Sequence, residues 1–379
     1  MSNTNTPATQ DRPELQELIE RIVDNGFVGA SLRVHDRHGE WVGSAGVSEL
    51  GATTPPPVDG HVRIGSNTKT FTAAIVLRLV AEGRIELDAP AIGYLPDYAL
   101  DERVTVRMLL QHTSGIFNIT GELYEDGTIV PGVPSTIAGK EWVDKRFETY
   151  RPEDLANLAL SKPARFEPGT GWSYSNTNYI IARLLVEQVT GRSLAEEAQR
   201  LIFGPLGMTD TVLPGASTDL PEPHPHAYYR YSDGGEQHTV DVTLHNPSWV
   251  CTGGDMISTT ADLHTFIRAL LDGTLLPEPL LAEMLRTHDT GIPGMPYGLG
   301  VFVQETEGGA TLITHNGGIA GYATLMYSTP DASVTMTAYL TFVDDAEMTL
   351  APVFQVTQKT LVDAVFGGEP GNALSDKAS

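Results

Sequence analysis

The amino-acid sequence predicts an α+β fold, in which an antiparallel sheet flanked by helices is built from both chain ends and an all-helical lobe is inserted between them. The first observation is that segments with strand-like alternation of apolar and polar residues gather near the two ends of the chain. The second is that the middle of the chain shows helical periodicity, with long irregular segments between the helices. Because one apolar face of each element has to be buried, the strands of both ends are expected to share one sheet.

The elements follow in order. Apolar residues at helical spacing predict a helix over 15–23, which Gly26 ends. Two alternating segments then flank a turn at 36–39 and predict paired strands at 28–34 and 41–47. In the middle, periodic segments that each end at a glycine predict helices at 70–82, 179–190 and 262–271. The last part of the chain predicts strands at 297–304, 310–314, 322–328 and 334–342, and a final helix at about 346–366.

Two segments, 117–150 and 214–247, show little periodicity and are expected to be long loops that line or cover a site. These elements predict a single domain with a tail at each end. The expected bounds are a flexible tail at 1–12, a domain at 13–366 and a disordered tail at 367–379. Within the domain, the α/β lobe is expected at about 13–80 and 276–366, and the helical lobe at about 81–275.

The composition excludes several classes of function. Among 379 residues, 24 are Lys or Arg and 48 are Asp or Glu, so the formal net charge is −24. Such a chain is a poor partner for nucleic acid or an anionic membrane, and a small-molecule or peptide-like substrate is expected instead. The single cysteine, Cys251, rules out an internal disulfide and a thiolate zinc cluster. We expect no metal and no cofactor. Because no signal peptide is visible, we expect a cytoplasmic location, the alternative being a secreted protein whose leader was removed.

The first candidate for chemistry is the pair Ser66 and Lys69. At i and i+3, the two side chains lie on one face of a helix, where Ser66 is close to the helix N-terminus. The helix is apolar nearly all round, so Lys69 should be partly desolvated, which favours its neutral form and makes it a proton acceptor. The alternative is that Ser66 only caps the helix and Lys69 extends to solvent.

Two further motifs lie later in the chain. Tyr174 and Asn176 offer a phenol for proton transfer and an amide that can hold a substrate carbonyl, although a polar loop that caps the next helix would look the same. His315 leaves a predicted strand and precedes Gly317 and Gly318, which let a substrate backbone approach the strand edge. The alternative there is a glycine-rich turn with a surface histidine.

Taken together and in this order, the three motifs resemble those of the serine β-lactamase and penicillin-binding-protein superfamily, in which S-x-x-K is followed by Tyr/Ser-x-Asn and by Lys/His-x-Gly. The Y-S-N motif and the histidine resemble the branch of class C β-lactamases, soluble D-Ala-D-Ala carboxypeptidases and esterases. Further segments whose sequence is similar to this branch lie at 64–66, 94–96, 109–115 and 203–208, and the resemblance covers about 14–366.

The resemblance implies that Ser66 is the nucleophile and that Lys69, together with Tyr174, accepts its proton. It also implies that Tyr174 protonates the leaving group and that Asn176 holds the acyl side chain. His315 would stand behind Tyr174. The backbone N–H groups of Ser66 and Gly318 would form the oxyanion hole.

Two departures from the family pattern bear on the substrate. Soluble carboxypeptidases of this branch have hydroxyl residues on both sides of Gly317, where this chain has Asn316 and Gly318. They also hold the terminal carboxylate with an arginine, at a place that an ungapped count gives to Phe302. We therefore expect Asn316, Gly317 and Phe302 to contact a substrate that has no free terminal carboxylate.

The function that this implies is a serine hydrolase or acyltransferase that passes the acyl group of an ester or amide to water or to an amine. Transacylases and cyclising thioesterases of natural-product pathways use the same fold. The alternative is a D-Ala-D-Ala carboxypeptidase. A non-catalytic β-lactam sensor fits less well, because no catalytic residue is missing. The histidines of the segment 214–247 are expected in a solvated loop, and Cys251 in the core.

Overall fold

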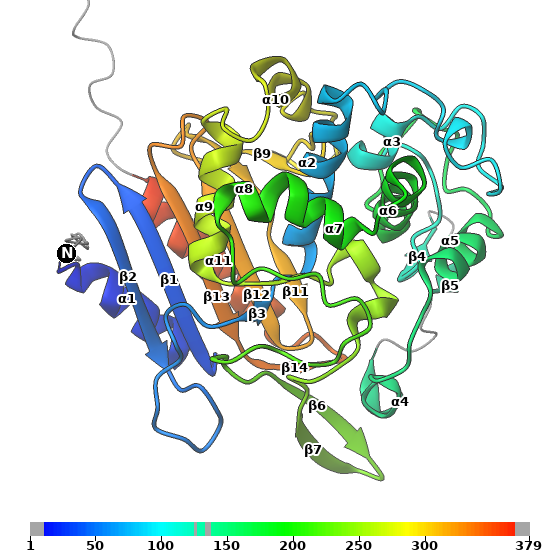
Figure 1. The fold of residues 1–379 in the computed structure, drawn as a ribbon. Coiled ribbons are helices and arrows are strands. Elements are labelled where there is room, and N and C mark those ends of the chain that lie inside the picture. The colour runs from blue at the N-terminus through cyan, green and yellow to red at the C-terminus, as the bar shows by residue number, and fades with distance from the viewer. Residues whose placement is uncertain (1–10, 125–126, 133–137, 368–379) are drawn as a thin grey trace, which may run out of the picture.

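The computed structural model describes residues 11–124, 127–132 and 138–367, and its centre is a seven-stranded sheet (Figure 1). The strand order is β2-β1-β13-β12-β10-β9, and β11 also pairs with β12. Every pairing within this sheet is antiparallel, and β1 from the N-terminal part lies against β13 from the C-terminal part. The strands are β1 (Gly29–Asp36), β2 (Gly39–Gly46), β9 (Phe302–Glu305), β10 (Thr311–Thr314), β11 (Gly317–Ile319), β12 (Tyr322–Ser328) and β13 (Thr335–Thr341). The predicted α+β class and the sheet closed by both chain ends are confirmed.

Helices cover both faces of this sheet. One face packs against α1 (Pro13–Asp24) and α11 (Ala351–Phe366), because alternate strand residues such as Leu32 and Leu340 share a buried cluster with Leu18 and Leu361. The other face packs against α9 (Thr260–Leu271), which crosses in front of the sheet in Figure 1. The sheet is therefore the middle layer of three.

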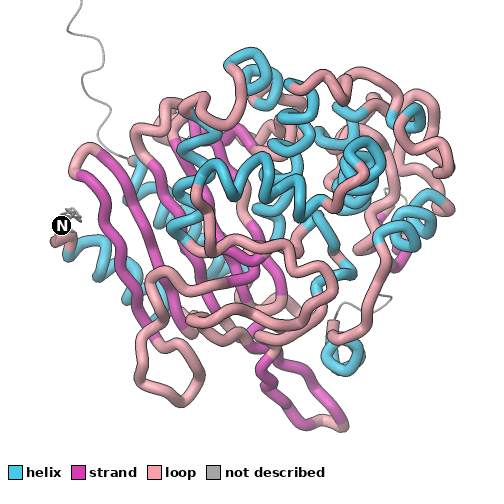
Figure 2. The backbone as a smooth tube through the Cα atoms, in the orientation of Figure 1, coloured by secondary structure: helices cyan, strands magenta, loops and turns pink. Residues whose placement is uncertain are grey.

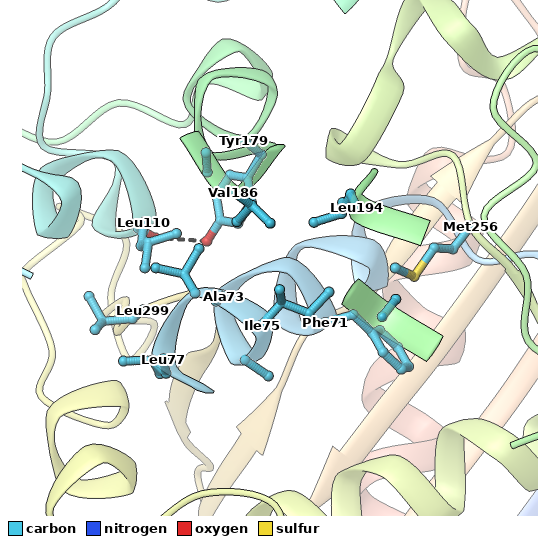
Figure 3. Packing of buried hydrophobic residues seen from close by; sticks show 14 of the residues in the cluster. Phe71, Ala73, Ile75, Leu77, Leu110, Tyr179, Val186, Leu194, Met256 and Leu299 are labelled. Carbon is cyan, nitrogen blue, oxygen red and sulfur yellow. Dashed lines mark hydrogen bonds between the residues drawn. The ribbon is translucent and has the colours of Figure 1, made fainter. Parts of the chain in front are cut away.

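The helix α2 (Thr68–Ala81) runs through the centre of the molecule, as its apolar sequence predicts. Figure 3 shows Phe71, Ala73, Ile75 and Leu77 of this helix among apolar side chains from several other segments. The helix begins two residues earlier than expected and ends before Gly83, whose φ of +70° suits a glycine stop. This burial on all sides fixes the position of the residues at its first turn.

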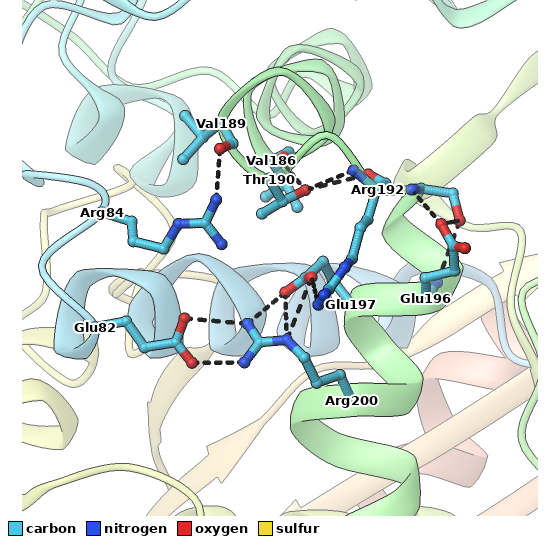
Figure 4. A network of polar contacts seen from close by, with 10 residues as sticks. Glu82, Arg84, Val186, Val189, Thr190, Arg192, Glu196, Glu197 and Arg200 are labelled. Carbon is cyan, nitrogen blue, oxygen red and sulfur yellow. Dashed lines mark hydrogen bonds and ion pairs between the residues drawn. The ribbon is translucent and has the colours of Figure 1, made fainter.

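The remaining helices are distributed along the segment between β2 and β9. An ion-pair network joins the end of α2 to two of them, because Arg200 binds both Glu82 and the buried Glu197, which also binds Arg192 (Figure 4). These helices are α3 (Val106–Gln111), α4 (Gly139–Lys145), α5 (Pro152–Leu160), α6 (Asn176–Thr190), α7 (Leu194–Ala198), α8 (Gly204–Leu206) and α10 (Glu278–Met284), with a short π-helical turn at Gln199–Phe203.

The inserted segment is not purely helical, which corrects the expectation of an all-helical lobe. Figure 2 shows a hairpin projecting from the molecule, formed by β6 (Tyr228–Asp233) and β7 (Glu236–Asp241) within the segment predicted as a loop. The physical reason is the turn at Gly234 and Gly235, whose φ values of 60° and 89° suit a two-residue hairpin loop. A parallel strand, β14 (Val343–Asp345), pairs with β6. The other predicted loop contains β4 (Gly121–Leu123), β5 (Ile129–Pro131) and α4, and β3 (Val62–Arg63) pairs with β8 (Ile257–Ser258).

Two predicted boundaries near the C-terminus are wrong for local reasons. The strand expected at 297–304 begins only at Phe302, because Gly300 has a φ of +79° and interrupts it. The helix expected from about 346 begins at Ala351, after Met348 adopts a φ of +50°. The predicted tails fall almost entirely outside the described residues, and the division into two lobes stays a prediction.

Candidate active site

Ser66 and Lys69 meet at the start of α2. Ser66 lies in the 3-10 turn η1 (Gly65–Asn67), directly before the helix, and is partly exposed, whereas the residues on either side of it are buried. Lys69 is completely buried, and its Nζ lies 3.2 Å from Ser66 Oγ. The fold therefore leaves the serine hydroxyl accessible and places an amine beside it, as the spacing predicts.

Complete burial of Lys69 favours its neutral form. Nζ donates to Asn176 Oδ1 at 2.7 Å and to the carbonyl oxygen of Gly253. Burial lowers the pKa of Lys69 well below its ordinary value, and the charge of Asp255 opposes this shift. A neutral amine has two N–H donors and one lone pair. Because both N–H groups have carbonyl acceptors, the lone pair is left for the proton of Ser66.

Tyr174 lies beside both Ser66 and Lys69. Its ring centroid is 4.6 Å from Lys69 Nζ, and burial raises the pKa of its phenol, while a hydrogen bond with Ser66 opposes that increase. The phenol is therefore protonated at neutral pH. This favours Lys69 as the group that accepts the serine proton and Tyr174 as the acid that delivers a proton to the leaving group.

Asn176 begins α6 and belongs to the same cluster. Besides accepting from Lys69, its Nδ2 donates to Thr120 Oγ1 at 3.4 Å, and its backbone N–H donates to Asn118 Oδ1 at 3.0 Å. The resemblance assigns Asn176 to the acyl side chain of the substrate. The geometry adds that its carbonyl orients the lysine amine.

His315 lies behind Tyr174, with 6.3 Å between the ring centroids, but its hydrogen bonds go elsewhere. Nδ1 is 2.9 Å from the carbonyl oxygen of Asn316, so Nδ1 carries the proton, and Nε2 accepts from Tyr297 Oη at 3.2 Å. Burial and, to a smaller extent, the charge of Lys69 lower the pKa of His315 to about 3. His315 is therefore a neutral part of the wall behind the phenol.

Phe302 completes this wall. Its ring centroid is 5.6 Å from that of His315 and 4.6 Å from that of Tyr297, and its backbone lies opposite Thr314 in the β9–β10 pairing. In the described part of the chain, no hydrogen bond, ion pair or ring contact joins an arginine to Phe302 or to His315. The side of the site next to His315 is thus aromatic and uncharged.

The third motif approaches the serine through its glycines. A Cβ on Gly317 would lie 1.8 Å from the carbonyl oxygen of Ile64 and 2.8 Å from the backbone nitrogen of Ser66. A Cβ on Gly65, which has a φ of +50°, would lie 2.5 Å from the backbone nitrogen of Gly318. Only glycines allow this close approach, which brings the N–H groups of Ser66 and Gly318 to the same place, as an oxyanion hole requires.

Asn316 lies differently from its neighbours. Its Nδ2 donates to Tyr327 Oη at 2.7 Å, and this hydroxyl also accepts from Gln358 of α11. The side chain therefore turns to the face of the sheet that α11 covers, away from Lys69. A contact between Asn316 and substrate stays a prediction, as do the substrate contacts of Gly317 and Phe302.

Three residues of the site were not singled out by the sequence analysis. The ring of His112 packs at a tilt against that of Tyr174, with 4.4 Å between the ring centroids, and its Nδ1 accepts from the backbone N–H of Ser175. Tyr297 connects His315 to the other aromatic rings. Asp255 is buried, and its Oδ1 has no hydrogen-bond partner among the described residues. The only sequence signal for these three residues was the segment 109–115, which contains His112 and whose sequence is similar to the family branch named above.

A possible metal cluster lies elsewhere in the fold. His35, Glu40 and His264 have ligand atoms within 4.8 Å of one another, on β1, β2 and α9. Strands β13 and β12 separate this group from β11 in the sheet. Arg33 already binds Glu40, so a cation would have to displace a guanidinium group, and we assign no metal there. Cys251 is a separate case: it is buried, as expected, and its Sγ accepts a hydrogen bond from Arg183.

The sequence of this chain is similar to those of several known proteins. The sequence profile of the Beta-lactamase family matches residues 15–353. The chain is 24% identical over 330 residues to penicillin-binding protein 4* of Bacillus subtilis, which covers 83% of this chain and 68% of that protein. It is 29% identical over 346 residues to a D-aminopeptidase of Brucella ovis, which covers 89% and 61%. It is 34% identical over 222 residues to esterase EstB of Burkholderia gladioli, which covers 54% and 53%. The chain thus spans only part of the length of these relatives.

Solved structures agree with the fold. A D-stereospecific amidohydrolase from Streptomyces sp. has a TM-score of 0.80 and 34% sequence identity, with 95% of this chain and 100% of that chain covered. A D-amino acid amidase from Ochrobactrum anthropi also has a TM-score of 0.80, at 24% identity, and covers 94% and 99%. Among the described residues, no helix is both long and apolar enough to cross a bilayer. The profile match and the site built on Ser66 and Lys69 together show that the chain belongs to the beta-lactamase family and is an enzyme of the serine-hydrolase type.

Proposed function

We propose that this protein is a serine acyl-enzyme hydrolase that cleaves amides and esters of D-amino acids whose leaving group carries no free carboxylate. The observation that carries the proposal is the uncharged aromatic wall of Phe302, Tyr297 and His315 beside the nucleophile. The similarity to a D-stereospecific amidohydrolase and to a D-aminopeptidase supports the D-amino acid part.

The residues account for each step of such a reaction. Neutral Lys69 takes the proton of Ser66 as Oγ attacks the carbonyl carbon, and the N–H groups of Ser66 and Gly318 hold the oxyanion. Tyr174 then gives a proton to the departing amine or alcohol, which leaves an acyl-serine. Attack of water on this ester releases the acid, while an added amine would give a new amide instead.

The wall argues for a neutral leaving group on energetic grounds. A carboxylate placed beside Phe302 would lose its hydration and gain no cationic partner there. Leaving a buried charge unpaired costs several kcal/mol, which corresponds to orders of magnitude in rate. A carboxamide or ester at the same place does not carry this cost.

The second candidate is the D-Ala-D-Ala carboxypeptidase activity, which the similarity to penicillin-binding protein 4* favours. The two candidates differ in one measurable property. A carboxypeptidase prefers a peptide with a free C-terminal acid, whereas the proposed enzyme prefers the matching C-terminal amide.

The nucleophile is tested by covalent labelling. Intact-mass spectrometry after reaction with a β-lactam or an activated ester should show one acyl adduct on the wild type and none on Ser66→Ala. The matched control is Ser217→Ala, because Ser217 is an exposed serine on a different segment. An adduct that persists in Ser66→Ala contradicts the assignment.

The leaving-group preference is tested by comparing kcat/KM for D-Phe-D-Ala with that for its C-terminal carboxamide, because the two scissile amides have similar intrinsic reactivity. We expect kcat/KM to be at least about 10-fold higher for the carboxamide than for the free acid. Phe302→Arg should reduce or reverse this preference for the carboxamide. Phe302→Leu is the control, because it keeps the wall apolar. If the free acid is the better substrate of the wild type, the carboxypeptidase function replaces the function proposed here.

A further inference from the structure

Two cavities share the exposed residue Gly318 in their lining. The first, of about 340 Å³, is mostly apolar and lies between β11 and the segment that leads into α11, and its lining includes Phe27 and Phe354. The second, of about 250 Å³, is aromatic and is lined by Trp142 and Trp249, among others. Gly318 lines both cavities, so both adjoin the residue whose N–H group would hold the substrate oxyanion.

The two cavities share one charged residue, Asp344 of β14, together with Phe342. Its neighbour Asp345 is buried and forms an ion pair with Arg230. Asp344 is only half-buried, and no ion pair in the described residues includes it. The backbone N–H of Asp345 donates to its Oδ1 at 2.9 Å. A backbone hydrogen bond from Gly321 also stabilises the carboxylate. Because a carboxylate has about four acceptor positions, some remain for a ligand.

The surroundings of Asp344 make a cation the fitting ligand. Burial, with a smaller contribution from the charge of Asp345, raises the pKa of Asp344 despite the backbone hydrogen bonds from Asp345 and Gly321, so the ionised carboxylate is only partly compensated in the free protein. A donor with a positive charge supplies that compensation, whereas a second anion in the same cavities would add repulsion.

We infer that Asp344 binds the free α-ammonium group of the acyl donor, and that the enzyme therefore selects amino acid amides and esters with an unblocked amine. The inference rests on the proposed function. When the substrate carbonyl oxygen occupies the oxyanion hole at Gly318, the α-carbon is one bond from the carbonyl carbon and carries both the amine and the side chain. The amine is then close to the shared wall at Asp344, and an aromatic side chain has the cavity of Trp142 and Trp249 beside it.

The test uses three substrates that differ only at the α-carbon: D-phenylalanine amide, N-acetyl-D-phenylalanine amide and 3-phenylpropanamide. For the wild type, we expect kcat/KM to fall about 10- to 100-fold when the ammonium group is acetylated or removed, the range for a hydrogen bond to a charged group. In Asp344→Asn, the ratio between D-phenylalanine amide and 3-phenylpropanamide should approach one. Because it is a ratio within one variant, a general loss of folded enzyme does not change it.

The matched control is Glu347→Gln, which removes the same charge from an exposed residue three positions later that lines a different cavity. This variant should keep the wild-type ratio, which separates local recognition from a change in net charge. The same ratio is taken from Kd values by calorimetry in the Ser66→Ala background, where binding is measured without turnover. A wild-type ratio near one, or an unchanged ratio in Asp344→Asn, overturns the inference. A preference for free C-terminal acids would overturn only the proposed function, because it concerns the leaving group.

Discussion

Substituting alanine for Gly317 should abolish most of the activity by displacing the oxyanion hole. The added Cβ would lie 1.8 Å from the carbonyl oxygen of Ile64, while ordinary contacts begin at 3.4 Å. Relieving the clash therefore requires β11 and the turn η1 to separate by about 1.6 Å, and a misplacement of 1 Å costs on the order of 100-fold in rate. We expect single-turnover acylation by an activated ester to fall at least about 100-fold.

Gly318→Ala is the control for this variant. Its Cβ would meet only the carbonyl oxygen of Tyr322, at 3.8 Å, so the substitution fits without movement of the backbone. It should lose far less acylation rate than Gly317→Ala, while both keep the circular dichroism spectrum of the wild type. If Gly317→Ala acylates within about twofold of the wild type, the close approach of the third motif is not what builds the oxyanion hole.

Three more predictions concern buried ionisable side chains. Lys69→Ala and Tyr174→Phe should each slow single-turnover acylation by several orders of magnitude. Because both groups handle the same proton, the double variant should be little slower than the slower single variant. Fully additive losses would contradict a shared proton path. Asp255→Asn removes the charge that raises the pKa of Lys69, so the acid limb of the kcat/KM pH profile should move to lower pH, and a shift to higher pH would contradict this role. Burial lowers the pKa of His264 and His315 to about 3, from 6.5 in the unfolded chain, so the stability that they contribute is present above pH 6.5 and is lost as the pH falls towards 3. Urea unfolding below pH 6 should show a slope of about 1.4 kcal/mol per pH unit for each such histidine, and His264→Gln should reduce it by that amount; an unchanged slope would refute the account.

The central elements could be predicted because their sequence signals are local and strong. The helix of Lys69 is apolar on all sides, and β12, expected at 322–328, has these same bounds in the structure. Ser66 and Lys69 share a helix turn, so their contact follows from spacing alone. The order of the three motifs then indicated which distant residues would join them.

The rest depended on backbone conformation and long-range packing, which a sequence pattern does not show. The late start of α11 depends on the positive φ of Met348, a residue that seldom adopts it. The partner of His315 is Tyr297, from a segment that was expected to be a regular strand. Asp255 and Asp344 gain their importance from what surrounds them, and nothing in their own sequence neighbourhood marks them.

The pairing of β1 with β13 has a consequence for how this enzyme comes into being. Roughly 250 residues separate Ser66 from Gly318, so the proposed oxyanion hole unites an early and a late part of the chain, and contacts of this range slow folding. A nascent chain that has completed α2 already holds Ser66 and Lys69 in one helix turn, yet it cannot stabilise an oxyanion. Catalysis therefore requires that β12 and β13 have entered the sheet beside β1, so the early part of the chain carries the nucleophile but is not active by itself.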